Sequence, residues 1–306
     1  MEIFRDFFVI VPTEEISEIE AILRHSIVDN SSNGKLFRAI IEPLLLQYTT
    51  TSAALLMVDE RELLRTAGGV EKVESWWYPY SLQMILKLLA SSLVRTPFYL
   101  TLDADVLCSK DGLSEEDLLP QGKGNYVPEG RDVHSTWWSD AALHLGVEEK
   151  PLDEGFGVTP AVLSTRGAEL VFERLQTVHG SASFLRRILD SSLSEPGGSG
   201  GWTEYTLYRT TLDHYGVFDS LHAVGPTKLL GDGSVWYAGQ FDAWNITAAF
   251  DEDPAAFVVV QSTAQAGVSR VLEKIGYGLD AEGGEERGPT SSGLPKALRR
   301  RILHQM

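Results

Sequence analysis

The segment Phe98-Tyr-Leu-Thr-Leu-Asp103-Ala-Asp105-Val106 decides the predicted fold. Its first five residues are mostly apolar, which is typical of a short strand buried inside an α/β domain. Two carboxylates separated by one residue follow where this strand ends. In open α/β sheets, ligands collect beyond the carboxyl ends of the strands. The segment therefore predicts a buried strand that delivers two aspartates to a ligand site.

The residues upstream extend this prediction into alternating strands and helices. Residues 7–12 and 53–58 form continuous apolar runs and predict two more buried strands. Residues 16–23 and 79–93 repeat their apolar side chains at helical spacing. The order strand, helix, strand, helix, strand predicts an α/β fold with a mixed, mainly parallel sheet flanked by helices.

The second part of the chain has a less regular pattern. Residues 109–150 show few regular patterns, and residues 194–201 are rich in glycine and serine and predict a flexible loop. Further strands are predicted at 158–163 and 257–262, and further helices at 168–175, 183–193 and 203–215. We expect one domain over residues 1–280, with a nucleotide-binding half at 1–108, an acceptor and catalytic half at 109–280, and a mobile linker and short basic helix at 281–306.

The composition limits the possible partners. The chain has 306 residues, 43 Asp and Glu against 26 Lys and Arg, and a formal net charge of −17. Such a chain has no general attraction to nucleic acid or anionic lipid, so we expect no nucleic-acid partner. No apolar run approaches the roughly 20 residues of a membrane span. A phosphate-bearing ligand would need a local positive charge, which a bound divalent cation can supply.

The expected compartment follows from the cysteine count and the first residues. Cys108 is the single cysteine, which excludes an intramolecular disulfide. The first residues contain acidic side chains and no small-residue cleavage site, so no secretory signal is predicted. Both features favour the cytoplasm. The alternative is the Golgi lumen, if this chain is the catalytic part of a membrane-anchored protein.

Asp103 and Asp105 are candidate ligands of Mn²⁺ or Mg²⁺, because hard divalent cations prefer oxygen ligands. Such a cation would bridge a diphosphate and stabilise the charge that develops as a nucleoside diphosphate leaves. The alternative is an ordinary acidic loop after a strand. Gln83 and Lys87 lie four residues apart, and therefore on one face of the predicted helix before this strand.

A hydrophobic strand followed by Asp-x-Asp and Val-Leu resembles the GT-A class of glycosyltransferases. Two further segments, Trp76-Trp-Tyr-Pro-Tyr-Ser-Leu-Gln83-Met-Ile-Leu-Lys87 and Gly197-Gly-Ser-Gly-Gly-Trp-Thr203-Glu204-Tyr205-Thr-Leu-Tyr208, are similar to a GT-A-like family of unknown function. The similar segments form islands between residues 7 and 262. The resemblance implies a GT-A (Rossmann-like) fold. It also implies metal-dependent transfer of a hexose or pentose from a nucleotide-sugar donor, a UDP-sugar first of all, to a glycan or other hydroxyl acceptor.

The resemblance also implies roles for single residues. Asp105 would be the principal metal ligand, and Asp103 would face the metal or the ribose. Lys87 would reach a donor phosphate or pair with an Asp-x-Asp carboxylate, and its alternative is a solvated helix lysine. The implied nucleotide and donor residues are Val11, Pro12, Thr13, Asp59, Gln83, Lys87, Asp103, Ala104, Gly157 and Thr159.

Glu204 is the predicted catalytic carboxylate. It follows the Gly-rich loop near a helix start, where a general base would deprotonate the acceptor hydroxyl. The alternative is a first-turn glutamate that stabilises the helix amino terminus. The neighbouring residues Trp202, Thr203 and Tyr205 are the predicted acceptor-binding residues, and the alternative for Trp202 is a position in the core.

Many GT-A enzymes complete the metal shell with a late histidine, which this chain lacks at the corresponding place. Gln261 and Ser262 are the candidates there, with His134, His144 and His222 as alternatives elsewhere. Two other functions stay open. A sugar nucleotidyltransferase would carry a basic, Gly-rich loop where this chain has Pro12-Thr-Glu-Glu. A non-catalytic GT-A-like carbohydrate-binding protein would not need a complete metal shell.

Overall fold

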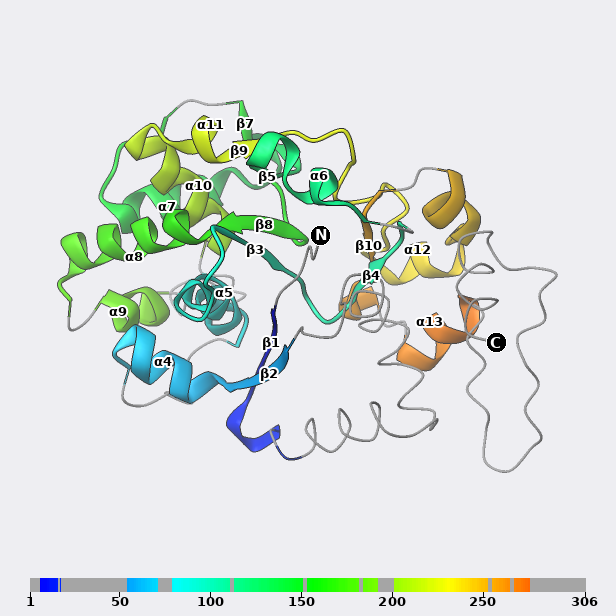
Figure 1. Ribbon diagram of the computed structural model, residues 1–306, viewed down its shortest axis with the longest axis horizontal. Coiled ribbons are helices and arrows are strands. Elements are labelled where there is room, and N and C mark those ends of the chain that lie inside the picture. The colour runs from blue at the N-terminus through cyan, green and yellow to red at the C-terminus, as the bar shows by residue number, and fades with distance from the viewer. Residues whose placement is uncertain are drawn as a thin grey trace.

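The structure is a computed structural model, and it describes residues 6–15, 17, 54–70, 79–110, 113–150, 153–181, 184–191, 201–252, 255–264 and 267–275. Within these ranges the chain is a mixed α/β protein, with helices packed around short strands (Figure 1). This confirms the predicted mixed α/β class. None of the helices in these ranges has both the length and the apolar character needed to cross a membrane.

The strands of the described residues form two-stranded pairs. They are β1 (Asp6–Val11), β2 (Ala54–Asp59), β3 (Phe98–Thr101), β4 (Val106–Cys108), β5 (Gly124–Asn125), β6 (Pro128–Gly130), β7 (Glu154–Phe156), β8 (Ala161–Ser164), β9 (His222–Ala223) and β10 (Phe257–Val259). The pairs β1–β2 and β5–β9 are parallel, whereas β3–β8, β4–β10 and β6–β7 are antiparallel. A mainly parallel sheet is therefore not seen in the part of the chain that is described.

The α-helices of the described ranges are α4 (Glu60–Gly68), α5 (Pro79–Leu89), α6 (Glu115–Leu118), α7 (Ser135–Leu145), α8 (Thr165–His179), α9 (Phe184–Ser191), α10 (Glu204–Tyr215), α11 (Phe218–Leu221), α12 (Ala238–Asp242) and α13 (Val268–Lys274). Shorter helical turns are η1 (Thr13–Glu15), η2 (Ala90–Ser92), η3 (Pro120–Gly122), η4 (Arg131–His134), η5 (Ala248–Glu252) and η6 (Ser262–Ala264).

Most of the predicted elements are present. The strands expected near 7–12, 53–58, 98–102, 158–163 and 257–262 are β1, β2, β3, β8 and β10, and the helices expected at 79–93, 168–175, 183–193 and 203–215 are α5, α8, α9 and α10. Other predicted elements lie largely or wholly outside the described residues, namely the helix at 16–23, the loop at 194–201 and the segment at 281–306.

The expectation of few regular elements in residues 109–150 was wrong, because α7 crosses this region. Trp138, Ala141, Ala142 and Leu145 are buried along one face of α7, which is the spacing of an amphipathic helix. Gly146 ends the helix with a φ of 57°, a left-handed conformation that glycine adopts at little cost. Helix α4 was also not predicted, and it begins where Asp59 accepts hydrogen bonds from the first turn.

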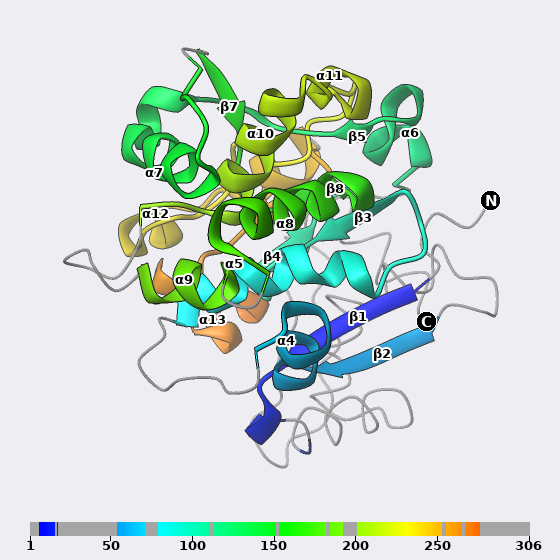
Figure 2. The ribbon, with the colours of Figure 1, turned by 90° about the vertical axis from the view of Figure 1, so that its left-hand side faces the viewer.

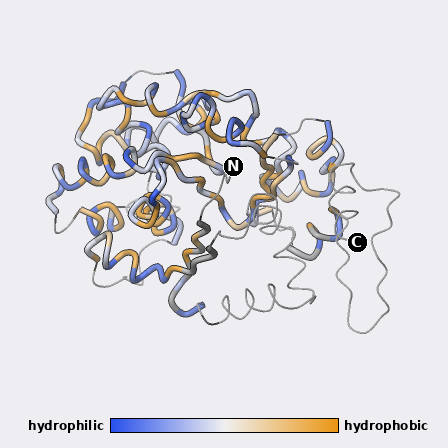
Figure 3. Tube along the Cα trace, viewed as in Figure 1, coloured by the Kyte–Doolittle hydropathy of each residue, from blue (hydrophilic) through white to orange (hydrophobic). Residues whose placement is uncertain are grey.

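The largest apolar cluster joins α5, α8 and α10 to β8, with Ile10 of β1 and Val58 of β2 packed against it. Figure 3 shows that hydrophobic residues concentrate along α5 and along the neighbouring strands. A second and a third cluster cover β4 and β10. In Figure 2, α5 lies at a level between the β1–β2 pair and the β3–β8 pair. From this position Gln83 and Lys87 of α5 contact Asp103, just beyond the end of β3.

Candidate functional site

Asp103, Ala104 and Asp105 lie in a tight turn between β3 and β4. The turn closes through a hydrogen bond from Val106 N to Asp103 O at 3.2 Å. Strand β3 pairs with β8, whereas β4 pairs with β10, so two different strand pairs fix the two sides of the turn. Ala104 is exposed at its tip. The structure therefore presents the two aspartates at a surface turn with firmly held ends.

Asp103 uses only one of its carboxylate oxygens within the described residues. Its Oδ1 accepts a hydrogen bond from Gln83 Nε2 at 3.0 Å and lies 2.6 Å from Lys87 Nζ. No hydrogen bond or ion pair from this part of the chain reaches Oδ2. The side chain is 25% exposed, so the second oxygen is left for water or a ligand.

Asp105 is held in a similar one-sided way. Its Oδ2 accepts a hydrogen bond from the backbone N–H of Ser262 at 2.9 Å, and its carbonyl accepts one from Val260 at 3.0 Å. In the described ranges no partner reaches Oδ1. Ser262, one of the two residues expected to approach the site, thus approaches it through its backbone amide. Each aspartate of the turn thus has one oxygen that no described residue bonds.

Lys87 lies between two carboxylates. Its Nζ is 2.6 Å from Asp103 Oδ1 and 2.8 Å from Glu204 Oε1, and its side chain is 13% exposed. The ammonium also lies 5.4 Å from the centre of the Tyr205 ring. Burial alone would lower the pKa of Lys87, but the charges of Glu204 and Asp103 outweigh it and raise this pKa well above the usual lysine value. A lysine pKa raised in this direction keeps Lys87 charged at neutral pH. Its pairing with the Asp-x-Asp segment is one of the two contacts that the sequence predicts.

Glu204 is the first residue of α10. Thr203 caps this helix, because its Oγ1 accepts a hydrogen bond from Thr206 N at 3.1 Å while its own N–H donates to Thr206 Oγ1 at 2.9 Å. The Glu204 side chain is only 3% exposed and accepts a hydrogen bond from Lys87. Its carboxylate thus combines a first-turn position, which the helix dipole favours, with a buried ion pair.

Gly157 and Thr159 flank the same end of the β3–β8 pair. Thr159 precedes β8 by two residues and Asp103 follows β3 by two, and the strands run antiparallel with Thr101 opposite Ala161. Thr159 is 6% exposed, and its hydroxyl has no hydrogen-bond partner in the described part of the chain. A Cβ at Gly157 would lie 2.9 Å from the carbonyl oxygen of Val127, so only glycine fits.

The three residues predicted to contact an acceptor lie in the core. Trp202 is 0% exposed, and Thr203 and Tyr205 are each 4% exposed. The Tyr205 hydroxyl lies 3.3 Å from Thr101 Oγ1, directly beneath the turn, and burial raises the pKa of this tyrosine. In this structure these side chains belong to the core, and none of them forms part of an exposed surface.

The residues at the end of the β1–β2 pair form a separate corner. Val11 lies opposite Asp59 in the register of the two strands, and Pro12 and Thr13 follow directly. The Oδ1 of Asp59 accepts hydrogen bonds from Arg61 N at 2.8 Å and Glu62 N at 3.4 Å. The structure therefore gives Asp59 the role of a helix cap, which the sequence analysis did not anticipate.

The charges at the turn favour a cation. Asp103, Asp105 and Glu204 carry three negative charges against one positive charge on Lys87, which leaves −2. In the described residues no group of three or more His, Cys, Asp or Glu side chains is arranged to hold a metal ion. The alternative histidines are engaged elsewhere: His134 stacks on Trp137, His144 lies against Trp202, and His222 is bonded to Tyr208. A cation at the turn would therefore have two aspartates and solvent or ligand oxygens around it.

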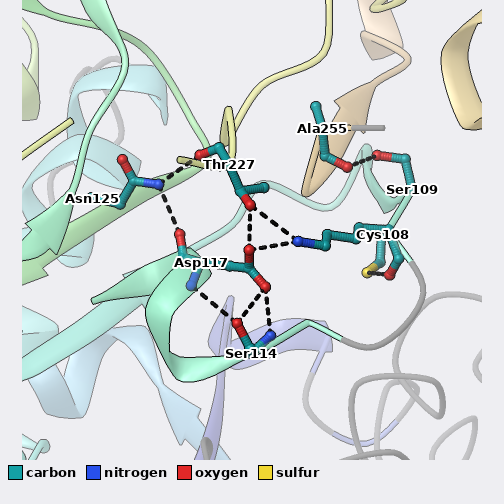
Figure 4. A network of polar contacts seen from close by, with 8 residues as sticks. Cys108, Ser109, Ser114, Asp117, Asn125, Thr227 and Ala255 are labelled. Atoms are coloured by element: carbon teal, nitrogen blue, oxygen red, sulfur yellow. Dashed lines mark hydrogen bonds and ion pairs between the residues drawn. The ribbon is translucent and has the colours of Figure 1, made fainter. Parts of the chain in front are cut away.

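A second polar network lies beyond the other end of β4 (Figure 4). Asp117 accepts hydrogen bonds from Lys110 Nζ, Thr227 Oγ1 and both donors of Ser114. Asn125 Nδ2 donates to the carbonyls of Asp117 and Thr227 at 2.7 and 2.8 Å. These contacts tie α6, β5 and the segment around Thr227 together, and both oxygens of Asp117 are fully used.

The described part of the chain is thus a mixed α/β protein with an acidic turn beyond one strand pair. A model described as a family of unknown function (DUF6492) matches residues 1–281. The chain belongs to that family. No curated protein sequence matches it.

Proposed function

We propose that this protein transfers a sugar from a nucleotide-sugar donor to a hydroxyl acceptor, with a divalent cation held at the Asp103–Asp105 turn. The observation that carries the proposal is the pair of half-used carboxylates, since each aspartate is fixed by one oxygen and leaves the other without a partner in the described residues. A GT-A arrangement of the sheet is part of the proposal. It is supported by the parallel β1–β2 pair at the start of the chain and by the resemblance of the sequence.

The residues at the turn fit Mn²⁺ or Mg²⁺. Carboxylate oxygens are the ligands that these ions prefer, and a divalent cation balances the net charge of −2 in the cluster. Asp105 and Asp103 would hold the ion. When bound, it would neutralise the donor diphosphate and stabilise the leaving nucleoside diphosphate.

The other residues would orient the donor around this centre. Gln83 holds Asp103 in place, and Thr159 offers a buried hydroxyl without a partner in the described ranges. Gly157 allows the chain to pass close to Val127. Glu204 is buried and bonded to Lys87, so we assign it to positioning Lys87; proton abstraction from an acceptor would need Glu204 to become accessible first.

Two alternatives remain to be separated from sugar transfer. A sugar nucleotidyltransferase would use the same cation but would release pyrophosphate from a nucleoside triphosphate. A non-catalytic carbohydrate-binding protein would release nothing. The product formed from each substrate separates all three functions.

The test is to incubate the protein with UDP-, GDP- and CMP-sugars, with and without Mn²⁺, and to follow nucleotide release and transfer to simple sugars. We expect Mn²⁺-dependent release of one nucleotide. Asp105→Asn should abolish this release and Mn²⁺-dependent nucleotide binding while the fold is retained, because a charged ligand is lost with little change of volume.

The matched control is Asp232→Asn, which removes the charge of an exposed aspartate that pairs, among the described residues, with Lys228 four positions before it. It should behave as the unaltered protein. Turnover and Mn²⁺ binding that survive Asp105→Asn would show that the cation is not held at this turn. Absence of release and of any thermal shift with every nucleotide plus Mn²⁺ would overturn the proposed enzyme.

A further inference from the structure

We propose that Lys87 is a phosphate-binding residue that exchanges one partner for another: Asp103 before the donor binds, and the donor diphosphate afterwards. Glu204 holds it throughout. This inference rests on the proposed function, since it requires a cation at Asp103 and a diphosphate beside it. The buried Lys87–Glu204 pair then takes part in ligand binding, whereas a purely structural pair would not.

The ammonium of Lys87 can donate one more hydrogen bond than the described residues accept. A lysine has three N–H donors, and in the described residues two carboxylates engage Nζ, Asp103 at 2.6 Å and Glu204 at 2.8 Å. The Tyr205 ring covers one side of the ammonium at 5.4 Å. The third donor has no partner in the part of the chain that is described. A phosphate oxygen at the turn could accept it.

The two partners of Lys87 differ in how easily they can be replaced. Glu204 is 3% exposed, so loss of Lys87 would leave a buried carboxylate without its charge partner. Asp103 is 25% exposed and keeps a second donor, Gln83, on the same oxygen. Asp103 can therefore release Lys87 at little cost, whereas Glu204 cannot.

A divalent cation held by Asp103 would favour this exchange. It would bind Asp103 next to the ammonium, and two cations on one carboxylate repel each other. The ammonium then gains by turning to a negatively charged diphosphate, with Glu204 as its fixed anchor. The cation and Lys87 would thus compete for Asp103 when no phosphate is present, and would cooperate when it is.

This competition and cooperation predict effects of opposite sign on two ligands. Lys87→Met should tighten binding of Mn²⁺ alone by about threefold or more, because a neighbouring positive charge is removed. The same substitution should weaken binding of inorganic pyrophosphate to the Mn²⁺-loaded protein by about tenfold or more, because a charge-assisted hydrogen bond is lost. A residue that only supported the fold would not shift the two affinities in opposite directions.

The measurements are Mn²⁺ titration followed by electron paramagnetic resonance, and calorimetric titration of pyrophosphate into Mn²⁺-saturated protein. If Lys87→Met fails to fold, the double variant Lys87→Met/Glu204→Gln removes the stranded carboxylate as well. It leaves the net charge of the cluster unchanged, so its pyrophosphate affinity reports the lost contact alone. Lys228→Met, at an exposed lysine paired with Asp232, is the control and should change neither affinity.

The outcomes separate this inference from the proposed function. Mn²⁺ binding by the unaltered protein, tighter Mn²⁺ binding by Lys87→Met and weaker pyrophosphate binding in the Lys87 variants together support the exchange, whereas an unchanged Mn²⁺ affinity in Lys87→Met overturns it. Mn²⁺ binding with unchanged pyrophosphate affinity in the variants overturns the exchange and leaves the metal site standing. No Mn²⁺ binding by the unaltered protein overturns the metal site and the exchange together.

Discussion

Two lysine–aspartate pairs lie on either side of β4, and they are built differently. The Nζ of Lys110 lies 2.5 Å from Oδ1 of Asp117, and the Nζ of Lys87 lies 2.6 Å from Oδ1 of Asp103. Both oxygens of Asp117 are occupied, Oδ1 by Lys110 and Thr227 and Oδ2 by the two donors of Ser114. Asp103 has donors on one oxygen only within the described residues. The two distances between charges are therefore nearly equal, and the number of bonded carboxylate oxygens distinguishes a structural pair from a candidate ligand site.

The pKa of Asp117 reflects its filled shell. Burial would raise this pKa, but the hydrogen bonds from Lys110, Thr227 and Ser114 outweigh burial and lower it from 3.8 to about 2. Because the folded-state pKa is the lower one, the stabilisation is complete above about pH 4 and is lost as the pH falls toward 2. Figure 4 shows Ser114 and Thr227, from two segments far apart in the sequence, bonded to this one carboxylate.

The largest effect is expected for Asp117→Ala. It leaves Lys110 and Thr227 without their common acceptor and breaks the capping box at the start of α6. We expect the free energy of unfolding to fall by about 3–5 kcal/mol, as for other broken buried pairs. Asp103→Ala should cost about 1 kcal/mol or less, because Lys87 keeps Glu204 and the site is partly solvated. Urea unfolding monitored by circular dichroism measures both.

The control for this pair is Asp232→Ala, which breaks an exposed ion pair with Lys228 and should cost less than about 0.5 kcal/mol. Equal destabilisation by Asp117→Ala and Asp103→Ala would remove the distinction between a structural network and a ligand site. So would loss of Mn²⁺ binding in the Asp117 variant at a temperature where it is fully folded.

His222 is a second closed network and extends the comparison to pH. Gly124 O can only accept, so Nδ1 of His222 carries the proton that faces it at 3.1 Å. In the neutral ring Nε2 then accepts from the Tyr208 hydroxyl at 2.8 Å, and this hydroxyl in turn accepts from Ser164 N at 2.8 Å. Every ring nitrogen is thereby used in the neutral form. The ring is 3% exposed, and burial is the main cause that lowers its pKa from 6.5 to about 4.

The predicted consequence is an acid-dependent loss of stability. Between pH 6.5 and about 4 the unfolded chain binds a proton at His222 that the folded chain does not. The free energy of unfolding therefore decreases as the pH is lowered, by about 1.4 kcal/mol per pH unit and about 3 kcal/mol in total. His222→Gln should lose this part of the slope. The measurement is the free energy of unfolding at several pH values between 4 and 7 for both proteins.

Comparison of slopes makes this test independent of the absolute stability of the variant. Other groups that titrate in the same range contribute equally to both proteins and cancel. Parallel curves for the two proteins would show that His222 is not the neutral, buried group that this network requires.

The sequence predicted the elements of the site better than their connections. The apolar runs of β1, β2 and β3 and the stripe of α5 are periodic signals, and they placed Gln83 and Lys87 on one face before Asp103. A run of three or four apolar residues carries no information on the direction of the strand it pairs with. The antiparallel pairing of β3 with β8 and of β4 with β10 was therefore not predictable. The contact of Lys87 with Glu204 joins α5 to α10 across 117 positions, a separation over which no local pattern predicts a contact.

Other differences were visible in the sequence but misinterpreted. The spacing of Trp138, Ala141, Ala142 and Leu145, with Gly146 after it, is a complete helix signal inside a region judged irregular. Trp202 was expected to bind an acceptor, with a core position as the alternative, and in the structure it lies fully buried. The same aromatic residue occurs in cores and in binding sites, so only its packing in the structure distinguishes the two.

The smallest predicted effect concerns Asp59, whose side chain caps α4 and was expected to assist the nucleotide. Asp59→Ala should lower the free energy of unfolding by about 1 kcal/mol, and Asp59→Ser, which also caps helices, should restore most of it. Thermal or urea unfolding measures both changes in stability.

The Mn²⁺-dependent affinity for UDP decides between the capping role and the nucleotide-binding role of Asp59. If Asp59 only caps the helix, Asp59→Ser should bind UDP as well as the unaltered protein. A stable Asp59→Ser protein that binds UDP about tenfold more weakly, a loss of about 1.4 kcal/mol, would instead place this carboxylate in the donor site. The half-used carboxylates of Asp103 and Asp105 would then not be the whole of the ligand site, because a fully engaged helix cap would belong to it as well.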